Sequence, residues 1–474
     1  MVREYETVIG LEVHVELASK SKIFCSCSTE FGAQPNTHTC PVCAGMPGTL
    51  PVLNRQVVEY AMAVGLALGC RINPICHFDR KNYFYPDNPQ NYQISQLYQP
   101  ICLGGGVKVG DKTIRIHEIH MEEDAGKLIH QEETGETLID YNRAGVPLIE
   151  IVSEPDMRNA EEVIAYLEAL RQTIQYLGAS DCKLNQGSMR ADVNLSLRQK
   201  GEEEYETRTE MKNLNSFKAI ARAIQAEADR QMKILEAGQE VLQETRRWDD
   251  LKGQSYSMRS KEDAKDYRYF PDPDLPPLVI DEAWVEAVKK AQPEFADAKA
   301  ARYQKEFGLP DYDIAILTGD KALADLFEAT TDLCHKPKKV SNWLMGEAMR
   351  LLKERELDWD QVNFAPDRLA DLIGLTEEGK ISMAVAKEIF EKIFDQNIDP
   401  LAYVEKEGLG MVQDQDQLAS LVQKVVDENP QSVSDYRAGK KKAMGYLMGQ
   451  LMRATKGQAD PGILQGLLRE ILEK

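Results

Sequence analysis

The residues best suited to chemistry in this chain are four cysteines near its N-terminus, in the segments Cys25-Ser-Cys27 and Cys40-Pro-Val-Cys43. Two close pairs of thiols separated by a loop supply the four ligands of a tetrahedral structural zinc site. Four ordinary buried or oxidised cysteines are the alternative, but that interpretation leaves the paired spacing to chance. The pattern therefore predicts structural Zn²⁺ bound by Cys25, Cys27, Cys40 and Cys43.

Polar side chains alternate with apolar ones in two further segments, as they do along a β-strand. In residues 11–17 the polar face carries Glu12, His14 and Glu16. In residues 190–197 it carries Arg190, Asp192 and Asn194. A solvated sheet face is the alternative explanation, because such faces are common in antiparallel proteins.

Glu150 stands alone inside the apolar segment 147–152, where solvation is a less natural explanation. A buried carboxylate needs a cation or a hydrogen-bonding partner. Carboxylate oxygens together with one imidazole are ligands that a hard divalent ion such as Mg²⁺ accepts, usually beside substrate phosphates. Further acidic residues at 122–124 and at 210 suit the same chemistry, although a solvated face explains Glu122 about as well.

Two other segments, residues 78–87 and 266–272, combine aromatic and cationic side chains. Side chains of this kind suit a phosphate, a nucleotide or the end of a tRNA. A hairpin edge packed by aromatic rings is the alternative. No G-x-x-x-x-G-K-[ST] sequence occurs, so the chain has no P-loop motif.

The elements that must position these residues fall into three regions. Residues 1–292 combine short strands with a few helices, among them 54–69 and 161–177, which predicts an α+β domain on an antiparallel sheet with a zinc-binding loop. Residues 293–409 follow a helical pattern, in which Ser382 is the expected N-cap of one helix. Residues 410–474 are expected to form a small all-helical domain.

Composition limits the class of protein. The chain has 474 residues, of which 43% are hydrophobic and 28% charged, as in soluble proteins with more than one domain. The sequence shows no membrane span or signal peptide, and its five other cysteines are scattered, which favours the cytoplasm. The net charge of −20 argues against unselective nucleic-acid binding, so an RNA partner requires a local basic patch.

Five segments, in order and over most of the chain, resemble the B subunit of aspartyl/glutamyl-tRNA amidotransferase, the GatB/GatE family. They are Ile9–Leu17, Asp79–Asp87, His120–Lys127, Leu148–Pro155 and Asp266–Pro271. The resemblance implies a catalytic cradle domain, a helical domain and a YqeY-like tail domain.

The resemblance also implies an ATP-dependent carbon–nitrogen ligase that works as one part of a heterotrimer. A glutaminase, the A subunit, would release ammonia from glutamine, and a small C subunit would tie A to B. The B subunit would use ATP and Mg²⁺ to phosphorylate the side-chain carboxylate of Asp-tRNA(Asn), Glu-tRNA(Gln) or both. Ammonia would then displace the phosphate. In agreement with this division of labour, the sequence contains no evident Ser-Ser-Lys or cysteine nucleophile for glutamine hydrolysis.

By the same resemblance, particular residues would bind the metal and the phosphates. The expected Mg²⁺ ligands are Glu12, His14, Glu123 and Glu150, with Asp192 and Glu210 as further candidates. Lys81 and Arg190 are expected to contact phosphate or to line a channel.

The C-terminal region contains the local basic patch that an RNA partner requires. Residues 437–456 include no Asp or Glu, and their glycines would let backbone approach phosphate closely. A solvated basic helix end is the alternative. Because the family's tail contacts the tRNA body, we expect tRNA to be bound by Arg437, Lys440, Lys441, Lys442, Arg453 and Lys456.

Two other functions are compatible with parts of the pattern. A non-catalytic zinc-ribbon RNA-binding protein would carry the same cysteines and an acidic sheet face that is only solvated, and it would turn over no ATP. A self-contained ligase that uses free ammonia and a small carboxylic acid would be active without tRNA. The five matching segments favour the tRNA amidotransferase over both.

Overall fold

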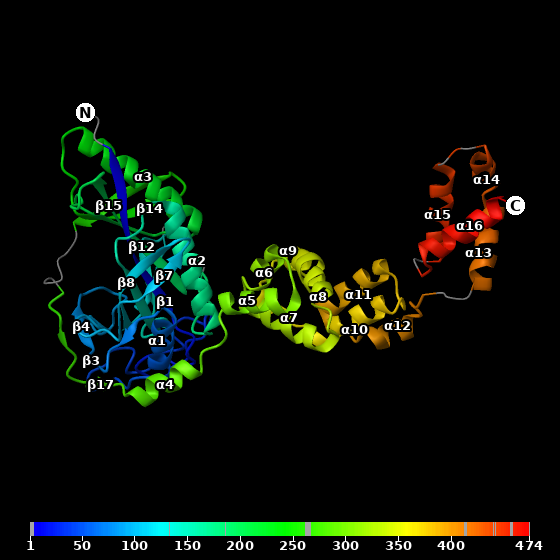
Figure 1. Cartoon of the computed structure of the whole chain (residues 1–474). Coiled ribbons are helices and arrows are strands. Elements are labelled where there is room, and N and C mark those ends of the chain that lie inside the picture. The colour runs from blue at the N-terminus through cyan, green and yellow to red at the C-terminus, as the bar shows by residue number, and fades with distance from the viewer. Residues whose placement is uncertain are drawn as a thin grey trace. The chain divides into compact units, whose positions relative to one another are not determined.

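A computed structural model describes residues 4–131, 133–184, 186–260, 267–411, 415–438, 440, 442–455 and 458–473. The chain forms two compact units, Met1–Phe295 and Ala296–Lys474. The first unit is α+β and the second is helical, so the predicted fold class is confirmed at that level (Figure 1). The predicted divisions near residues 293 and 410 stay predictions.

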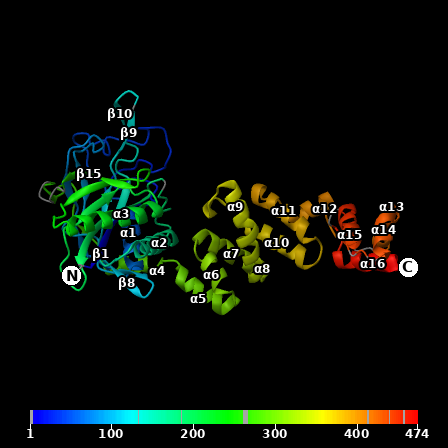
Figure 2. The ribbon, with the colours of Figure 1, turned by 90° about the horizontal axis from the view of Figure 1, so that it is seen from above.

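One large sheet forms the centre of the first unit (Figure 2). Its strands run in the order β15-β14-β13-β12-β1-β11-β8-β6-β2, and β7 pairs with β8. Their bounds are β15 (Gln254–Ser260), β14 (Glu244–Asp249), β13 (Thr209–Lys212), β12 (Met189–Gln199), β1 (Tyr5–Glu16), β11 (Pro147–Ser153), β8 (Lys112–Glu123), β6 (Cys102–Leu103), β2 (Arg71–Ile72) and β7 (Gly106–Val109).

The sheet is mixed, which corrects the expectation of an antiparallel sheet. Its other pairs are antiparallel, but β13 and β14 run parallel. Between them lies helix α3 (Phe217–Glu236). A helical crossover of this kind returns the chain to the same end of the sheet, so the next strand points in the same direction.

Three helices pack on the apolar side of the sheet, α1 (Arg55–Ala67), α2 (Ala160–Tyr176) and α3. Each begins at a side-chain cap, since Asn54, Asn159 and Ser216 accept hydrogen bonds from backbone N–H groups of the first turn. The predicted helices 54–69 and 161–177 are thus confirmed to within two residues at each end. Their apolar faces join the core residues of β1, such as Val13 and Val15.

A small sheet in the order β16-β4-β5 stands beside the large one. Its strands are β16 (Phe270–Pro271), β4 (Asp79–Asn82) and β5 (Tyr92–Ser95). The two predicted aromatic segments therefore meet, because β16 pairs with β4 through Phe270 and Arg80. The remaining elements of this unit are the pairs β9 (Lys127–Gln131) with β10 (Glu136–Asp140) and β3 (Ile75–Cys76) with β17 (Leu278–Val279), and helix α4 (Glu282–Lys290).

The second unit contains two separate hydrophobic clusters, one within residues 303–394 and one within residues 418–472. The predicted cap at Ser382 is confirmed, because its hydroxyl accepts a hydrogen bond from the N–H of Val385. The helices are α5 (Ala296–Phe307), α6 (Asp311–Leu317), α7 (Lys321–Cys334), α8 (Pro337–Trp343), η1 (Leu344–Ala348), α9 (Met349–Arg355), η2 (Trp359–Gln361), α10 (Pro366–Glu377), α11 (Met383–Gln396), α12 (Pro400–Glu407), α13 (Gln415–Glu428), α14 (Pro430–Arg437), α15 (Lys442–Ala454) and α16 (Pro461–Glu473).

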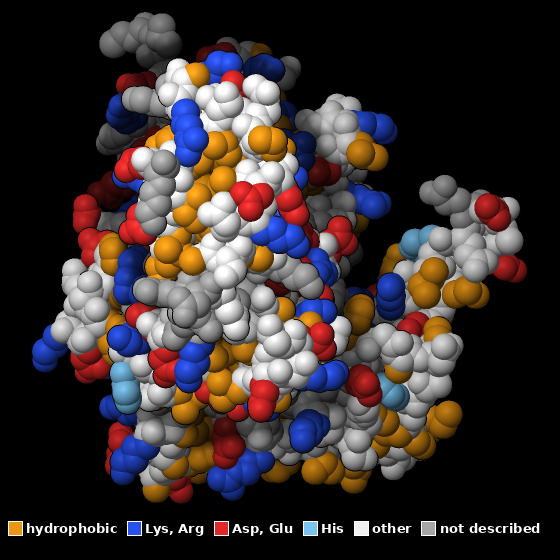
Figure 3. Space-filling model, turned by 90° about the vertical axis from the view of Figure 1, so that its right-hand side faces the viewer, with side chains coloured by type: hydrophobic (Ala, Val, Ile, Leu, Met, Phe, Trp, Pro, Cys, Tyr) orange, Lys and Arg blue, Asp and Glu red, His pale blue; other side chains and the backbone are white. Residues whose placement is uncertain are grey.

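Among the described residues, no helix is both long and apolar enough to cross a membrane. On the face of the molecule in Figure 3, basic and acidic side chains are interspersed.

Candidate functional site

The register of the large sheet gathers polar side chains from neighbouring strands on one face. Glu150 in β11 lies opposite His14 in β1 on one side and opposite His120 in β8 on the other. Glu12 lies opposite Asp192 in β12. Directly opposed residues of antiparallel strands share a face, so neighbouring strands contribute to one polar surface.

The first group on this surface is His14, Glu122 and Glu150. The Nε2 atom of His14 lies 3.4 Å from Oε2 of Glu150 and 3.6 Å from Oε1 of Glu122. One ligand atom from each of the three residues lies within 4.8 Å of the other two. His120 approaches the same carboxylate, with its Nε2 atom 3.1 Å from Oε2 of Glu150.

Electrostatics in this group favour a cation. Burial opposes charge on both imidazoles, but the surrounding carboxylates, with Glu150 first among them, together outweigh it and raise the pKa of His14 to about 9 and that of His120 to about 10. Burial also opposes ionisation of Glu150, yet the two imidazoles hold its pKa well below the usual range. The carboxylate is therefore charged and takes its counter-charge from protonated imidazoles.

A second group consists of Glu12, Asp192 and Glu210, whose ligand atoms again lie within 4.8 Å of one another. Burial, with repulsion from Glu150 and Glu210, raises the pKa of Glu12. The ammonium of Lys212 forms ion pairs with Asp192 and, at 3.0 Å, with Glu210. Two hydrogen bonds position the carboxylates, from Thr245 Oγ1 to Glu210 (2.9 Å) and from Asn194 Nδ2 to Glu12 (2.9 Å).

Both groups fit a hard divalent cation by their donors, which are carboxylate oxygens and one imidazole. In the second group Lys212 already neutralises part of the negative charge, as protonated His14 and His120 do in the first. Six of the expected residues line or adjoin this surface, namely Glu12, His14, Glu150, Asp192, Glu210 and Lys81.

A cavity of about 310 Å³ is lined by residues of this surface, and a second part of its lining, here called its second wall, comes from the small sheet and its neighbours. That wall includes Lys81, Ser95, Gln96, Tyr267 and Tyr269. The Nζ atom of Lys81 lies 5.2 Å from the ring centre of Tyr267. Although burial opposes charge on Lys81, its pKa is raised by neighbouring phenols and by Glu122 and Glu150. The cavity thus combines carboxylates, imidazoles and Lys212 of the large sheet with the ammonium and phenol donors of its second wall.

The structure does not bring Glu123 to this cavity. Successive side chains of a strand point to opposite sides, so Glu122 faces His14 while Glu123 points away. The carboxylate of Glu123 accepts hydrogen bonds from Ile94 N (3.0 Å) and Gln90 Nε2 (3.3 Å), and burial raises its pKa to about 8. The alternation of Glu118, His120 and Glu122 is the signal in the sequence that would have pointed to His120 and Glu122.

Arg190 is not among the residues that line the cavity, and it forms an ion pair with Asp124 instead. Its Nη2 atom donates to Asp124 at 2.9 Å, and Arg143 lies 3.5 Å from the same carboxylate oxygen. Burial opposes ionisation of Asp124, but the two arginines lower its pKa. Arg190 therefore neutralises a buried acid next to the cavity.

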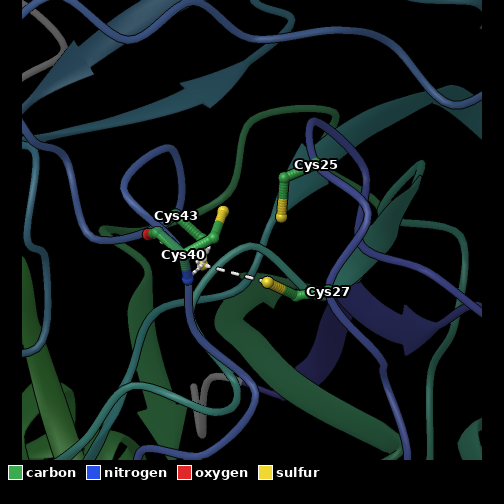
Figure 4. Close-up of side chains that lie close together, drawn as sticks. All are labelled: Cys25, Cys27, Cys40 and Cys43. Atoms are coloured by element: carbon green, nitrogen blue, oxygen red, sulfur yellow. Dashed lines mark hydrogen bonds between the residues drawn. The ribbon is translucent and has the colours of Figure 1, made fainter.

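The four cysteines converge as their spacing predicts. Their thiols point toward a shared centre (Figure 4), and the four sulfur atoms lie within 4.8 Å of one another. Cys43 Sγ is 3.9 Å from Cys40 Sγ and 4.0 Å from Cys27 Sγ, and all four thiols are free. Sulfur atoms at tetrahedral positions about 2.3 Å from one zinc ion would be spaced similarly. The buried ammonium of Lys22 lies 3.5 Å from Cys43 Sγ and offers a counter-charge to thiolate ligands.

The C-terminal basic residues are only partly available. Arg437 donates from Nε to the backbone oxygen of Leu472 (3.2 Å), and Lys440 forms an ion pair with Asp435 (2.9 Å). Lys442 and Arg453 lie near the two ends of α15. Lys441 and Lys456 lie outside the described residues.

Comparison with known proteins identifies the family of this chain. Residues 7–286 match the model of the GatB/GatE catalytic domain, and residues 325–472 match the model of the GatB domain. The chain is 64% identical over 475 residues to the B subunit of the aspartyl/glutamyl-tRNA(Asn/Gln) amidotransferase from Agathobacter rectalis, covering 99% of this chain and 100% of the relative. It is 63% identical to the protein of that name from Lachnospira eligens (100% of each chain) and 53% identical to that from Caldicellulosiruptor bescii (99% and 100%). The chain therefore belongs to the GatB/GatE family of tRNA amidotransferase B subunits.

Proposed function

We propose that this chain is the B subunit of a glutamine-dependent tRNA amidotransferase, acting in the cytoplasm. Its substrates are Asp-tRNA(Asn), Glu-tRNA(Gln) or both, and its products are Asn-tRNA(Asn) and Gln-tRNA(Gln). A glutaminase, the A subunit, supplies ammonia, and a small C subunit joins A to B. The relatives' shared name and their full-length match support this assignment.

The observation that carries the proposal is the cavity with two chemically different walls. Activation of a carboxylate by ATP brings several negative charges together, and it needs cations on more than one side. The second wall, with Lys81 and the tyrosines, supplies donors, while the large sheet supplies carboxylates and imidazoles. A solvated sheet face would not need a half-buried lysine in the same cavity as largely buried carboxylates.

In the proposed reaction, an oxygen of the substrate's side-chain carboxylate attacks the γ-phosphorus of ATP, and the bond to the ADP oxygen breaks. The nitrogen of ammonia then attacks the acyl carbon, the carbon–oxygen bond to phosphate breaks, and phosphate leaves with the bonding electrons. The nitrogen loses a proton, which leaves an amide. Lys81 is positioned to bind phosphoryl oxygens, because its ammonium reaches the cavity beside Tyr267 and Tyr269.

Mg²⁺ would be held by His14, Glu122 and Glu150, with Glu12, Asp192 and Glu210 as a second candidate group. When bound, the ion neutralises charge on the phosphoryl group. The four cysteines would hold Zn²⁺ in a closed shell without an open position, which makes that site structural.

The test is to purify the chain with its A and C partners and to supply ATP, Mg²⁺, glutamine and each misacylated tRNA separately. Amide formation and ADP release that both require misacylated tRNA support the proposal. Activity on a free carboxylic acid without tRNA would identify a self-contained ligase. RNA binding without any ADP release would identify a non-catalytic RNA-binding protein.

A further inference from the structure

Gln96 is a buried amide that lines the candidate cavity. It follows β5 directly, and only 1% of its surface is exposed. Its Oε1 atom accepts a hydrogen bond from the backbone N–H of Met121 at 3.0 Å. Met121 lies in β8 between His120 and Glu122, so this bond attaches Gln96 to the strand that carries both of them.

The orientation of the Gln96 amide follows from that bond. Only an oxygen can accept from the N–H of Met121, so the NH₂ group must occupy the other position. Its Nε2 atom has no hydrogen-bond partner among the described residues. Buried donors in folded proteins are almost always paired, so an unpaired one calls for a partner that the chain itself does not provide.

The backbone next to Gln96 is fixed as well. One oxygen of the buried Asp79 carboxylate accepts hydrogen bonds from the N–H groups of Leu97 (2.8 Å) and Tyr98 (3.2 Å). A hydrogen bond from β8 thus fixes the Gln96 side chain, and hydrogen bonds to Asp79 of β4 fix the backbone of the two residues that follow it. A donor held from two sides is preorganised and loses little conformational freedom when it binds a ligand.

We propose that Gln96 is a substrate-binding residue whose Nε2 atom donates a hydrogen bond to an anionic oxygen of the phosphoryl group that is transferred. This rests on the proposed function, because that function brings such a group into the cavity. The location supports the assignment, since Gln96 lines the same cavity as Lys81, Tyr269, Glu150 and His14. On the second wall, Lys81 supplies charge and Gln96 supplies a directional neutral donor.

The test uses the complete complex with its A and C partners and two substitutions. Gln96→Glu keeps an oxygen for the N–H of Met121 but removes the donor, and Gln96→Met removes both. We expect kcat/KM for tRNA-dependent amide formation to fall by about 10- to 100-fold in both, the usual effect of losing a hydrogen bond to a charged group. A higher KM for ATP would place the contact on bound ATP. A lower kcat at unchanged KM would place it on the phosphoryl group during transfer.

Gln93→Met is the matched control, because the Gln93 side chain donates to the backbone oxygen of Glu123, at 2.7 Å, and lies outside the cavity lining. It should lose thermal stability to a similar degree as Gln96→Met but keep the wild-type KM for ATP and kcat. Protection against heat by ATP and Mg²⁺ gives a second readout, which should be smaller in Gln96→Glu than in the wild type.

Wild-type kinetics and wild-type protection by ATP in both Gln96 variants would overturn the assignment and leave Nε2 as a donor to an ordered water only. An equal kinetic loss in Gln93→Met would also overturn it, because the effect would then be structural. If the wild-type complex itself forms no amide, the proposed function fails. Protection by ATP that depends on Gln96 would then still show that this residue binds the nucleotide.

Discussion

Among single residues, Glu150 has the most demanding environment. Two imidazoles flank its carboxylate at 3.1 and 3.4 Å. The negative charge of Glu150 and its neighbouring carboxylates raises the pKa of both imidazoles. A divalent cation would take over the role of counter-charge from the imidazole protons. Glu150 is therefore the residue on which the charge balance of the cavity depends.

Replacement of Glu150 by glutamine keeps the size of the side chain and removes its charge. We expect tRNA-dependent ADP release to fall by about 100-fold or more, as for the loss of a main electrostatic group in an active site. Glutamine hydrolysis should persist at least in part, because the proposed function assigns its nucleophile to a separate A subunit. Glu154→Gln, at an exposed pair with His117 after the same strand, is the control. Wild-type rates for Glu150→Gln at saturating Mg²⁺ would exclude it as an important ligand.

The four cysteines lead to a prediction about stability. Metal analysis of protein purified without chelator should find about one zinc ion per chain. Cys40→Ser should lose this zinc and lower the melting temperature of the first unit, because a structural site contributes its binding free energy to folding. Cys334→Ser, at a solitary and partly exposed cysteine, should change neither quantity. Wild-type protein without zinc would refute the site.

At the scale of elements, the alternation along β8 decides which of two adjacent acids faces the cavity. Glu122 meets His14, whereas Glu123 accepts from the backbone of β5. The sequence shows that the side chains of adjacent strand residues point to opposite faces of the sheet. Which of the two faces lines the cavity is decided by what packs against each face. The expected Mg²⁺ ligand was Glu123, but the acid that lies beside His14 is Glu122, one residue earlier in the strand.

The two acids form a matched pair for experiment. Glu122→Gln should raise the Mg²⁺ concentration needed for half-maximal ADP release by about 10-fold or more, as loss of a metal-site group does. Glu123→Gln should leave that concentration unchanged and instead lower thermal stability, because it disturbs hydrogen bonds to β5 and Gln90. The opposite result would show that Glu123 is the ligand, as expected from the family resemblance.

At the scale of the whole molecule, the net charge of −20 makes a local grip on tRNA necessary. The described basic residues at the C-terminus include Lys442 and Arg453, near the two ends of α15. The residues around them pack on a hydrophobic cluster of their own, within 418–472. Among the described residues, those that line the cavity lie between 12 and 269, so the cavity and the C-terminal basic residues can be changed separately.

Replacement of Lys440, Lys441 and Lys442 by alanine should weaken tRNA binding and reduce the slope of affinity against salt concentration. Each lost phosphate contact should lower that slope by about 1. The melting temperature and zinc content should stay the same. Alanine at Lys252, Lys289 and Lys290, three exposed lysines of the first unit, is the control. An unchanged slope in the triple variant of the C-terminal region would place the tRNA grip elsewhere, for example at Arg246 and Arg259.

The sequence by itself determined those features that depend on local spacing. Paired cysteines, alternating polar residues and helix caps are local patterns, and the thiols of Cys25, Cys27, Cys40 and Cys43 do converge. The family and the α+β class followed from motifs and periodicity in the same way. In each case the physical cause acts over a few residues, so the printed order of amino acids contains it.

Only the tertiary structure decided which distant segments face one another. The parallel pair of β13 and β14, the inward direction of Glu122, and the wall on which Lys81 and Gln96 stand all arise from long-range packing. The unpaired donor of Gln96 is the clearest case, because it becomes apparent only once the N–H of Met121, 25 residues away, has taken the oxygen. Local spacing limits which way a side chain can point, but the burial of apolar faces across the whole domain selects what it meets.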